Sequence, residues 1–324
     1  MAATVAASKA YDLAGGALRE DLRDIIYDIS PMDTIFLTKA GRGTAKSTTH
    51  EWLTDTLASV SAKNAAIEGN DFTAVARTLP ARLKNYTQIS RKDFEVTGTA
   101  RKVSNAGMRE LLAYHTAQAS KEIKRDIEAG LLSDEPASAG TSVSARVSAG
   151  AEAWIYAPNH INTNGTTTST TTAPVSGFAV SPVTDGSATA FVETGLQAML
   201  QQAWSMGGET DVILCGPTIY NKISAFTGIA TRFRDVGSRQ QAQIIGAADV
   251  YVSAFGSHNI VLSRWARATT VFALDMSTWE VAYLRPFETI DVAKVGDADR
   301  RALLAEYTLV AKAPMANTKA TNVS

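Results

Sequence analysis

The sequence is poor in the residues that would support a secreted, disulfide-bonded or membrane-embedded protein. It has one cysteine in 324 residues, Cys215, so no disulfide can form within the chain, and this fits a reducing compartment. No uninterrupted apolar stretch approaches the ~18 residues that a spanning helix needs. The N-terminus also lacks the basic and apolar regions of a signal peptide. We therefore expect a cytosolic protein without membrane contact, in which Cys215 is a buried structural thiol.

Charge of one sign is also missing. The formal net charge is -1 and the sequence pI is about 6.4, whereas a strongly basic nucleic-acid binder has a clear cationic excess. Any contact with DNA can therefore only be local. Apolar residues make up 45% of the chain and charged residues 19%, which predicts a folded protein with a sizeable core.

Recognisable catalytic or cofactor motifs are absent. The four histidines are far apart and show no metal-ligand spacing, and no Gly-x-Ser-x-Gly motif is present. Residues 41–47 resemble a phosphate-binding loop, but Ala40 and Ala45 occupy the two positions where that loop requires glycine. The sequence therefore predicts no catalytic residue, no cofactor and no metal. The histidines are His50, His115, His160 and His258.

The first hundred residues predict segments that are not stable without contacts to other parts of the protein or to a partner. Residues 1–45 read as an arm with a short amphipathic helix that ends at Ser30-Pro31. Residues 46–95 read as a long two-stranded hairpin. Two strands alone bury too little to be stable in water, so the hairpin is expected to lie on another surface, such as a second subunit. Its candidate contact residues are Trp52, Arg77, Arg82, Lys84, Arg91 and Lys92.

The basic members of that group allow two interpretations. Together with Arg101 and Lys102 they are balanced only by Asp93 and Glu95, so they could meet DNA or an acidic neighbour. Alternatively, they are solvated strand faces and ion pairs between subunits.

The rest of the chain predicts one long helix, an α/β unit and several strands. Apolar side chains recur at spacings of three and four through 105–132, which at 1.5 Å per residue gives a helix of roughly 40 Å. A Ser- and Thr-rich surface insertion follows at 133–189 around Trp154. Residues 190–265 read as helix 190–206, strand 212–215, a helix opening at Pro217 and a strand at 248–253. The remainder, to about 312, reads as strands at 259–263, 269–274, 280–284, 289–295 and 302–311. This order predicts an α+β protein.

Several motifs, in order, resemble one family of proteins. Before the long helix they are Ser30-Pro31-Met32-Asp33-Thr34-Ile35-Phe36, Glu51-Trp52-Leu53-Thr54-Asp55-Thr56-Leu57, Glu68-Gly69 and Leu83-Lys84-Asn85-Tyr86-Thr87-Gln88-Ile89. After the insertion they include Trp204-Ser205-Met206-Gly207-Gly208, Val250-Tyr251-Val252-Ser253-Ala254-Phe255-Gly256, Leu284-Arg285-Pro286, Lys294-Val295-Gly296-Asp297 and Glu306-Tyr307-Thr308-Leu309. The chain thus resembles the major capsid (major head) proteins of tailed bacteriophages.

The resemblance implies the Hong Kong 97-type capsid fold and an assembly function. It divides the chain into an N-terminal arm (1–45), an extended E-loop hairpin (46–95), a peripheral domain (96–189) with spine helix 105–132, an axial domain (190–265), and a return to the peripheral β-layer with a C-terminal tail (266–324). The axial loop at 231–243 would carry Arg232, Arg234 and Arg239.

The implied function is self-assembly through pentamers and hexamers into an icosahedral head. That head would enclose double-stranded DNA held by weak non-specific contact, and it would be assembled in the host bacterial cytoplasm. A portal protein and a separate scaffold or decoration protein are the implied partners.

Three other readings remain open at this point. An encapsulin-like shell shares the fold but encloses a cargo enzyme. An α/β enzyme could use 190–256 to bind a nucleotide, although no Gly-rich strand–turn–helix is present. An exported fibre is suggested by the Thr-rich run, but the long amphipathic helix and the missing signal argue against it.

Overall fold

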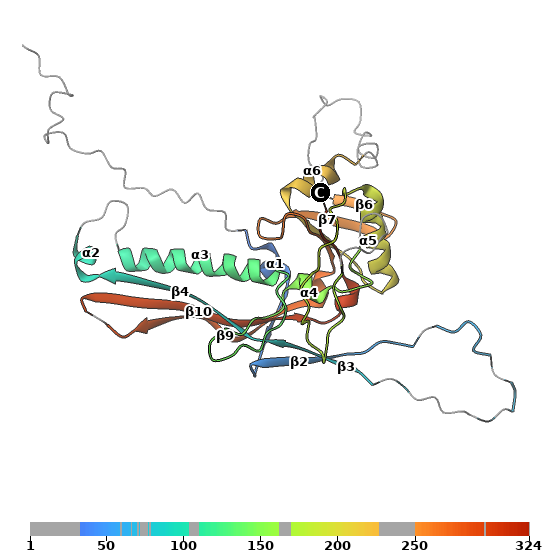
Figure 1. Ribbon diagram of the computed structural model, residues 1–324, viewed down its shortest axis with the longest axis horizontal. Coiled ribbons are helices and arrows are strands. Elements are labelled where there is room, and N and C mark those ends of the chain that lie inside the picture. The colour runs from blue at the N-terminus through green and yellow to red at the C-terminus, as the bar shows by residue number, and fades with distance from the viewer. Residues whose placement is uncertain are drawn as a thin grey trace, which may run out of the picture.

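The computed structural model describes residues 33–323, except positions 59, 66, 70, 72–76, 78, 104–109, 162–169, 227–249 and 295. A long sheet with a helix running along it forms an elongated body (Figure 1). A compact α/β unit stands at one end of this body, and a hairpin projects beyond it. The expected amphipathic helix of the arm and the three candidate arginines of the axial loop lie outside the described residues.

The body is built on a four-stranded sheet with the order β1-β9-β10-β4. Strands β9 (Trp279–Val292) and β10 (Ala298–Ala311) are antiparallel, and β4 (Gln88–Thr97) is antiparallel to β10. The short β1 (Gly41–Thr44) runs parallel to the first part of β9, from Glu280 to Tyr283. Segments from both ends of the chain therefore meet in one sheet.

Helix α3 (Leu111–Leu131) lies along this sheet and packs on β4 and β10 (Figure 1). Its buried apolar side chains, among them Ile123, Ile127 and Leu131, follow the spacing of one helix face. The long helix predicted for 105–132 is thus confirmed from Leu111 to Leu131, whereas Glu110 before it is extended. The short α1 (Ile35–Lys39) contacts α3, and α2 (Gly98–Lys102) follows β4 directly.

The α/β unit has a five-stranded sheet with the order β11-β8-β5-β7-β6. These strands are β5 (Val212–Cys215), β6 (Val250–Ser253), β7 (Gly256–Leu262), β8 (Val271–Leu274) and β11 (Thr318–Ala320). Helix α5 (Glu193–Ser205) contacts β8 and β11, and α6 (Pro217–Ser224) contacts β7. Both helices and strand β5 agree with the sequence-based prediction, and Pro217 begins α6 as expected.

The core continues through segments that look irregular in sequence. Helix α4 (Ala151–Trp154) is wholly buried, and Trp154 packs in the same cluster as α1, α3 and β10. The predicted anchor around Trp154 is therefore confirmed. The 3-10 helices η2 (Met276–Thr278) and η3 (Pro314–Ala316) lead into β9 and β11.

Two strand predictions are wrong because the partner strands, which the sequence does not reveal, set where these strands begin and end. Residues 280–284 and 289–295 are not two strands, because β9 is continuous and Pro286 and Phe287 together lie opposite Ala305. This is a β-bulge, one of the few places where a strand tolerates proline. The second strand of the predicted hairpin (46–95) is instead divided at Thr87, between β3 (Ala81–Tyr86) and β4. The hairpin therefore consists of β2 (Thr49–Thr54) and β3, while β4 belongs to the body.

The segment from 266 onward, expected to return to the peripheral layer, contributes strands to both sheets. Strands β8 and β11 pair in the five-stranded sheet, and only β9 and β10 return to the body. A short, fully buried strand such as β8 is equally suited to either sheet by composition, so its sequence does not specify its partner.

Replacing Ile127 with alanine tests the packing of α3 on the sheet. Ile127 is fully buried, so we expect the free energy of unfolding to fall by about 2–5 kcal/mol, measured by urea denaturation of the unassembled subunit. The matched change Ile67→Ala, at an exposed loop position, should alter it by less than about 0.5 kcal/mol. Equal effects of the two changes would contradict this packing.

Candidate assembly surfaces

The hairpin carries apolar side chains that its own subunit does not cover. Leu57 is 95% exposed, Ile67 78% and Leu79 88%, and the chain between β2 and β3 projects away from the body (Figure 1). Large apolar side chains exposed together mark contact surfaces rather than ordinary surface composition. The loop is therefore a candidate for contact with another molecule.

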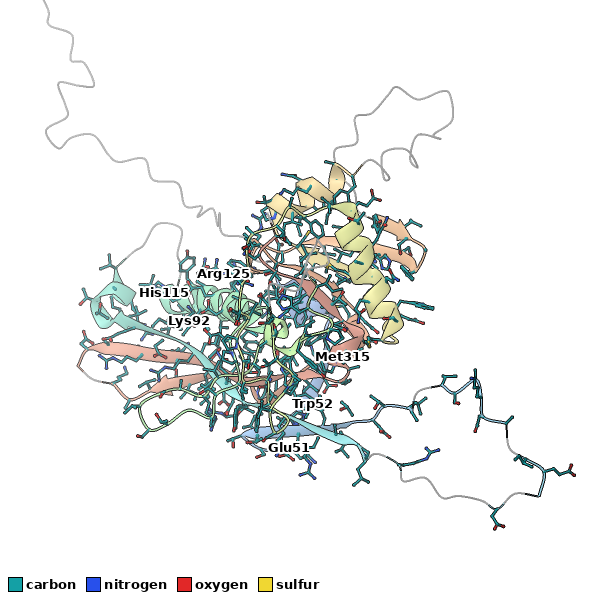
Figure 2. The ribbon with its side chains drawn as sticks, turned by 45° about the vertical axis from the view of Figure 1, so that its right-hand side comes forward. Glu51, Trp52, Lys92, His115, Arg125 and Met315 are labelled. Atoms are coloured by element: carbon teal, nitrogen blue, oxygen red, sulfur yellow. The ribbon has the colours of Figure 1, made fainter. Side chains whose placement is uncertain are left out.

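Trp52, one of the predicted intersubunit residues, lies at the base of this hairpin against its own subunit (Figure 2). Its Nε1 donates a hydrogen bond to the carbonyl oxygen of Ala311 at 2.9 Å, and its ring centroid lies 5.4 Å from that of Trp154. Trp52 thus fixes the direction in which the hairpin leaves the body.

The predicted basic candidates divide into paired and projecting residues. Arg82 and Lys84 both lie 3.3 Å from the Glu51 carboxylate across the hairpin. On β4, Arg91 lies 3.3 Å from Asp93, and Lys92 reaches Asp126 of α3 at 2.7 Å. Arg77 is exposed in the loop.

Within the described part of the chain, therefore, most of this basic group has acidic partners in its own subunit. Sequence reasoning placed these residues on one strand run, and the structure separates them between the hairpin and the body.

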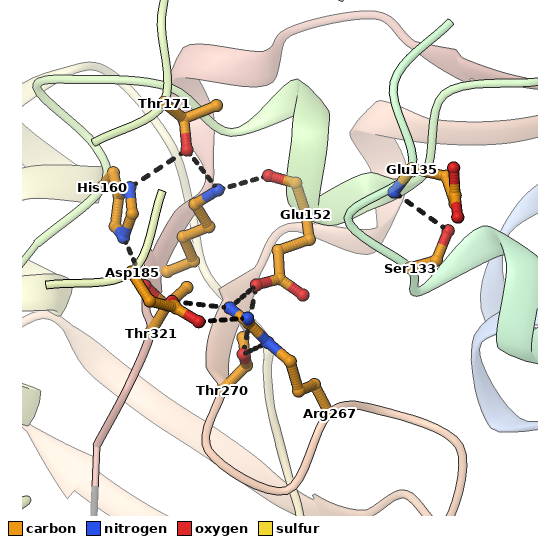
Figure 3. Close-up of polar contacts among 10 residues, drawn as sticks. Ser133, Glu135, Glu152, His160, Thr171, Asp185, Arg267, Thr270 and Thr321 are labelled. Atoms are coloured by element: carbon orange, nitrogen blue, oxygen red, sulfur yellow. Dashed lines mark hydrogen bonds and ion pairs between the residues drawn. The ribbon is translucent and has the colours of Figure 1, made fainter. Parts of the chain in front are cut away.

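A buried polar network connects the α/β unit to the core of the body (Figure 3). The carboxylate of Glu152 on α4 accepts hydrogen bonds from Arg267 and from the Thr270 hydroxyl. Arg267 also pairs with Asp185 at 2.6 Å. The Nζ of Lys319 on β11 donates to the backbone oxygen of Glu152 and to the Thr171 hydroxyl. Five separate segments thus meet around one buried carboxylate.

The centre of the network is closed to solvent, whereas the side chains of Arg267 and Asp185 at its edge are 30% and 37% exposed. Lys319 and Glu152 are both fully buried. Burial lowers the pKa of Lys319 to about 7, and burial raises the pKa of Glu152 although the Arg267 and Lys319 charges oppose it. A substrate has no path to Glu152 or Lys319, so these two buried groups tie segments of the chain together.

His160 completes this network. Its ring nitrogens lie 3.1 Å from the Thr171 hydroxyl and 2.7 Å from the Thr321 hydroxyl. Burial lowers the pKa of His160 to about 3, with further lowering by the Lys319 and Arg267 charges. The imidazole is therefore neutral at pH 7.

A second buried carboxylate fixes the segment that leads out of the N-terminal arm. Glu128 of α3 accepts hydrogen bonds from the backbone N–H groups of Phe36 and Leu37, each at 2.7 Å. These are N–H groups of the first turn of α1, which have no partner within the helix. Burial raises the pKa of Glu128, although these bonds act in the opposite direction. Sequence reasoning missed Glu128, because a glutamate beside an apolar helix face normally points into solvent.

The described residues were found to contain neither a metal-binding cluster nor a membrane-spanning helix. No group of three His, Cys, Asp or Glu side chains among them could hold a metal ion, and none of the described helices is long and apolar enough to cross a membrane. Cys215 is buried, as predicted, and burial raises the pKa of its thiol to about 12, which makes it unreactive.

Comparison with known proteins decides among the remaining readings. The sequence profile of the family described as "SU10 major capsid protein" matches residues 3–324. The chain belongs to this family. A related protein, the major capsid protein of Escherichia phage Phieco32, is 28% identical over 324 residues, which cover 89% of this chain and 90% of the relative.

Solved structures give the same answer for the fold. The capsid asymmetric unit of cyanophage A-1(L) superimposes with a TM-score of 0.67 at 13% identity, covering 94% of this chain and 97% of that one. A structure from Mycobacterium phage Bobi gives 0.60 at 13% identity, with 98% and 99% covered. The capsid of the native GTA particle gives 0.59 at 11% identity, with 98% and 100% covered.

The capsid protein therefore has the Hong Kong 97-type fold, and the predicted α+β class is confirmed. Its family is one of structural proteins of the phage capsid and not of enzymes, as the sequence predicted. The encapsulin-like alternative is not favoured.

The change Glu128→Gln tests the tie between α1 and α3. The amide of glutamine offers one acceptor oxygen in place of two, so one backbone N–H of α1 would lose its partner at a cost of about 1–3 kcal/mol in the free energy of unfolding. Hydrogen exchange of the Phe36 and Leu37 amides should accelerate. Glu122→Gln, on the same helix, should leave both measurements nearly unchanged, and a similar loss in both variants would refute the tie.

His160 should make the subunit acid-sensitive. The imidazole is neutral in the folded chain and becomes protonated on unfolding between its ordinary pKa of 6.5 and its folded value of about 3. Unfolding thus takes up a proton in this range. The free energy of unfolding should therefore decrease as the pH is lowered below 6.5, by up to about 1.4 kcal/mol per pH unit. His160→Gln should remove this part of the slope while the two curves run parallel above pH 7. Parallel curves from pH 6.5 to 4 would show that the histidine is already protonated in the fold.

Proposed function

We propose that this capsid protein builds an icosahedral head through pentamers and hexamers, and that the head encloses double-stranded DNA. The observation that carries the proposal is the projecting hairpin, whose exposed leucines and isoleucine lack cover from their own subunit. An obligate assembly buries such side chains on neighbours. The GTA capsid structure, which is similar to this chain, was computed with C5 symmetry, and this supports five-fold assemblies.

Each segment along the chain has its own proposed role in the shell. An arm (1–45) and an E-loop (46–95) reach neighbours, a peripheral domain (96–189, with 266–324) forms the wall, and an axial domain (190–265) surrounds the capsomer axis. The pairing of β8 and β11 supports extending the axial domain to include them.

The proposed partners are other copies of the chain, a portal protein, a separate scaffold or decoration protein, and packaged DNA through weak non-specific contact. Assembly takes place in the host bacterial cytoplasm. The ion pairs of Arg82, Lys84, Arg91 and Lys92 within their own subunit favour weak DNA contact over a dedicated binding strip, since paired cations release few counterions.

The double change Leu57→Asp with Leu79→Asp tests the hairpin contact. Each side chain is almost fully exposed in the subunit, so its fold and thermal midpoint should be unchanged, whereas a buried charge at each interface should prevent assembly. We expect negative-stain electron microscopy to show shells or hexamer sheets for the unaltered chain and only free subunits for the variant. Val143→Asp, at a 95% exposed valine outside the hairpin, is the control and should assemble normally. Normal shells from the double variant would exclude the hairpin as an essential contact.

A further inference from the structure

After Glu193 in its first turn, helix α5 presents no charged side chain to the outside of the molecule. The exposed residues of this helix include Thr194, Gln197, Ala198 and Gln201, and no Asp, Glu, Lys or Arg occurs from 194 to 208. At the overall charged content of 19%, these fifteen residues would hold about three charges. Exposed faces of helices normally carry charged residues, whereas the centres of protein interfaces are depleted of them.

Exposed aromatic side chains stand at the end of this face. Trp204 is 61% exposed and Met206 44%. Phe255, in the turn between β6 and β7, contributes a second ring whose centroid lies 5.8 Å from that of Trp204. The chain through this turn, from 251 to 263, also contains no Asp, Glu, Lys or Arg. We call the exposed residues of α5 together with Met206 and Phe255 the uncharged face.

Trp204 and Phe255 already touch within the subunit, so they form a preformed platform rather than two separate exposed rings. Tryptophan, methionine and other aromatic residues are the types enriched at protein contacts, and tryptophan dominates their energetic centres. An isolated exposed apolar residue needs no explanation, but a tryptophan and a phenylalanine in contact on a helix face free of charge indicate a partner.

The position of the uncharged face indicates which partner this is. In Figure 1, α5 lies on the same side of the molecule as the projecting hairpin. A neighbouring copy that receives the hairpin would therefore approach the molecule from the side on which α5 lies. Contacts within a ring of identical subunits are heterologous, so this face meets a different surface of its neighbour.

We propose that the uncharged face is a second lateral contact between copies of this chain, formed with the same neighbour that receives the hairpin. This inference rests on the proposed assembly function. Because the uncharged face offers no ion pair, the opposing surface of the neighbour must also be uncharged, or its charges would lose water without gaining a partner. The contact thus selects a matching surface by excluding charged ones.

The isosteric changes Gln197→Glu and Gln201→Glu, made together, test the proposal. Both side chains are exposed in the subunit, so its thermal midpoint should stay unchanged. With the full chain expressed in bacteria and separated on a gradient, we expect at least ten-fold fewer subunits in shells than for the unaltered chain. Asn221→Asp, an equivalent change at an exposed position of α6, is the matched control and should assemble normally.

Quenching of tryptophan fluorescence by acrylamide gives an independent measurement. The difference between the unaltered chain and Trp204→Phe reports Trp204, which should be quenched readily in free subunits and at least three-fold less in shells. Trp204→Phe should itself still assemble because the aromatic platform is kept.

The outcomes distinguish failure of the proposed assembly function from failure of the proposed second contact. Failure of the unaltered chain to form shells would overturn the proposed assembly function. Shells from the unaltered chain together with normal shells from the glutamate variant, or with Trp204 equally quenched in shells and subunits, would overturn only the second contact. Equal loss of assembly in Asn221→Asp would attribute the effect to added negative charge and would overturn it as well.

Discussion

The structure depends on the pairing of β9 with β10, two antiparallel strands of fourteen residues each. Strand β10 is the centre of the body: β4 pairs with its other edge, α3 packs on it, and from Leu303 to Ala311 it is buried throughout. Sheets need a covered face to be stable, and α3 supplies that cover along its length. The hairpin and the α/β unit are both attached to this one platform (Figure 1).

Buried charged groups then fix how the segments around this platform meet. Glu128 holds α1, Glu152 and Lys319 join α4 to β11, and Glu306 of β10 accepts hydrogen bonds from Arg146 and Arg285. Such groups add little net stability because their desolvation offsets their attraction, but leaving one of them unpaired is costly. Their effect is to exclude other arrangements of the same segments. A subunit that must fit identical neighbours benefits from such a fixed geometry.

Relatives with little sequence in common keep this architecture. Structures at 11–13% identity superimpose over more than nine-tenths of this chain. Strand pairing and helix-on-sheet packing require apolar residues of suitable size at periodic positions and tolerate many sequences that provide them. The ion pairs and buried ties named above are side-chain features, and these can differ where the backbone arrangement does not.

The sequence by itself determined the elements whose pattern is local: the long helix, the α/β unit with Pro217 at the start of α6, and the buried thiol of Cys215. Ordered motifs also indicated the family. Only the tertiary structure decided which strands pair, because a fully buried strand such as β8 suits either sheet, and whether Pro286 interrupts β9, because a bulge depends on the partner strand. It likewise showed the contacts of Trp52 with Ala311 and Trp154 in its own subunit, and it gave Glu128 and Glu152 their partners. Contacts between residues 90 or more positions apart leave no periodic signal in a single sequence, since each residue type is compatible with many partners and the packed fold selects one.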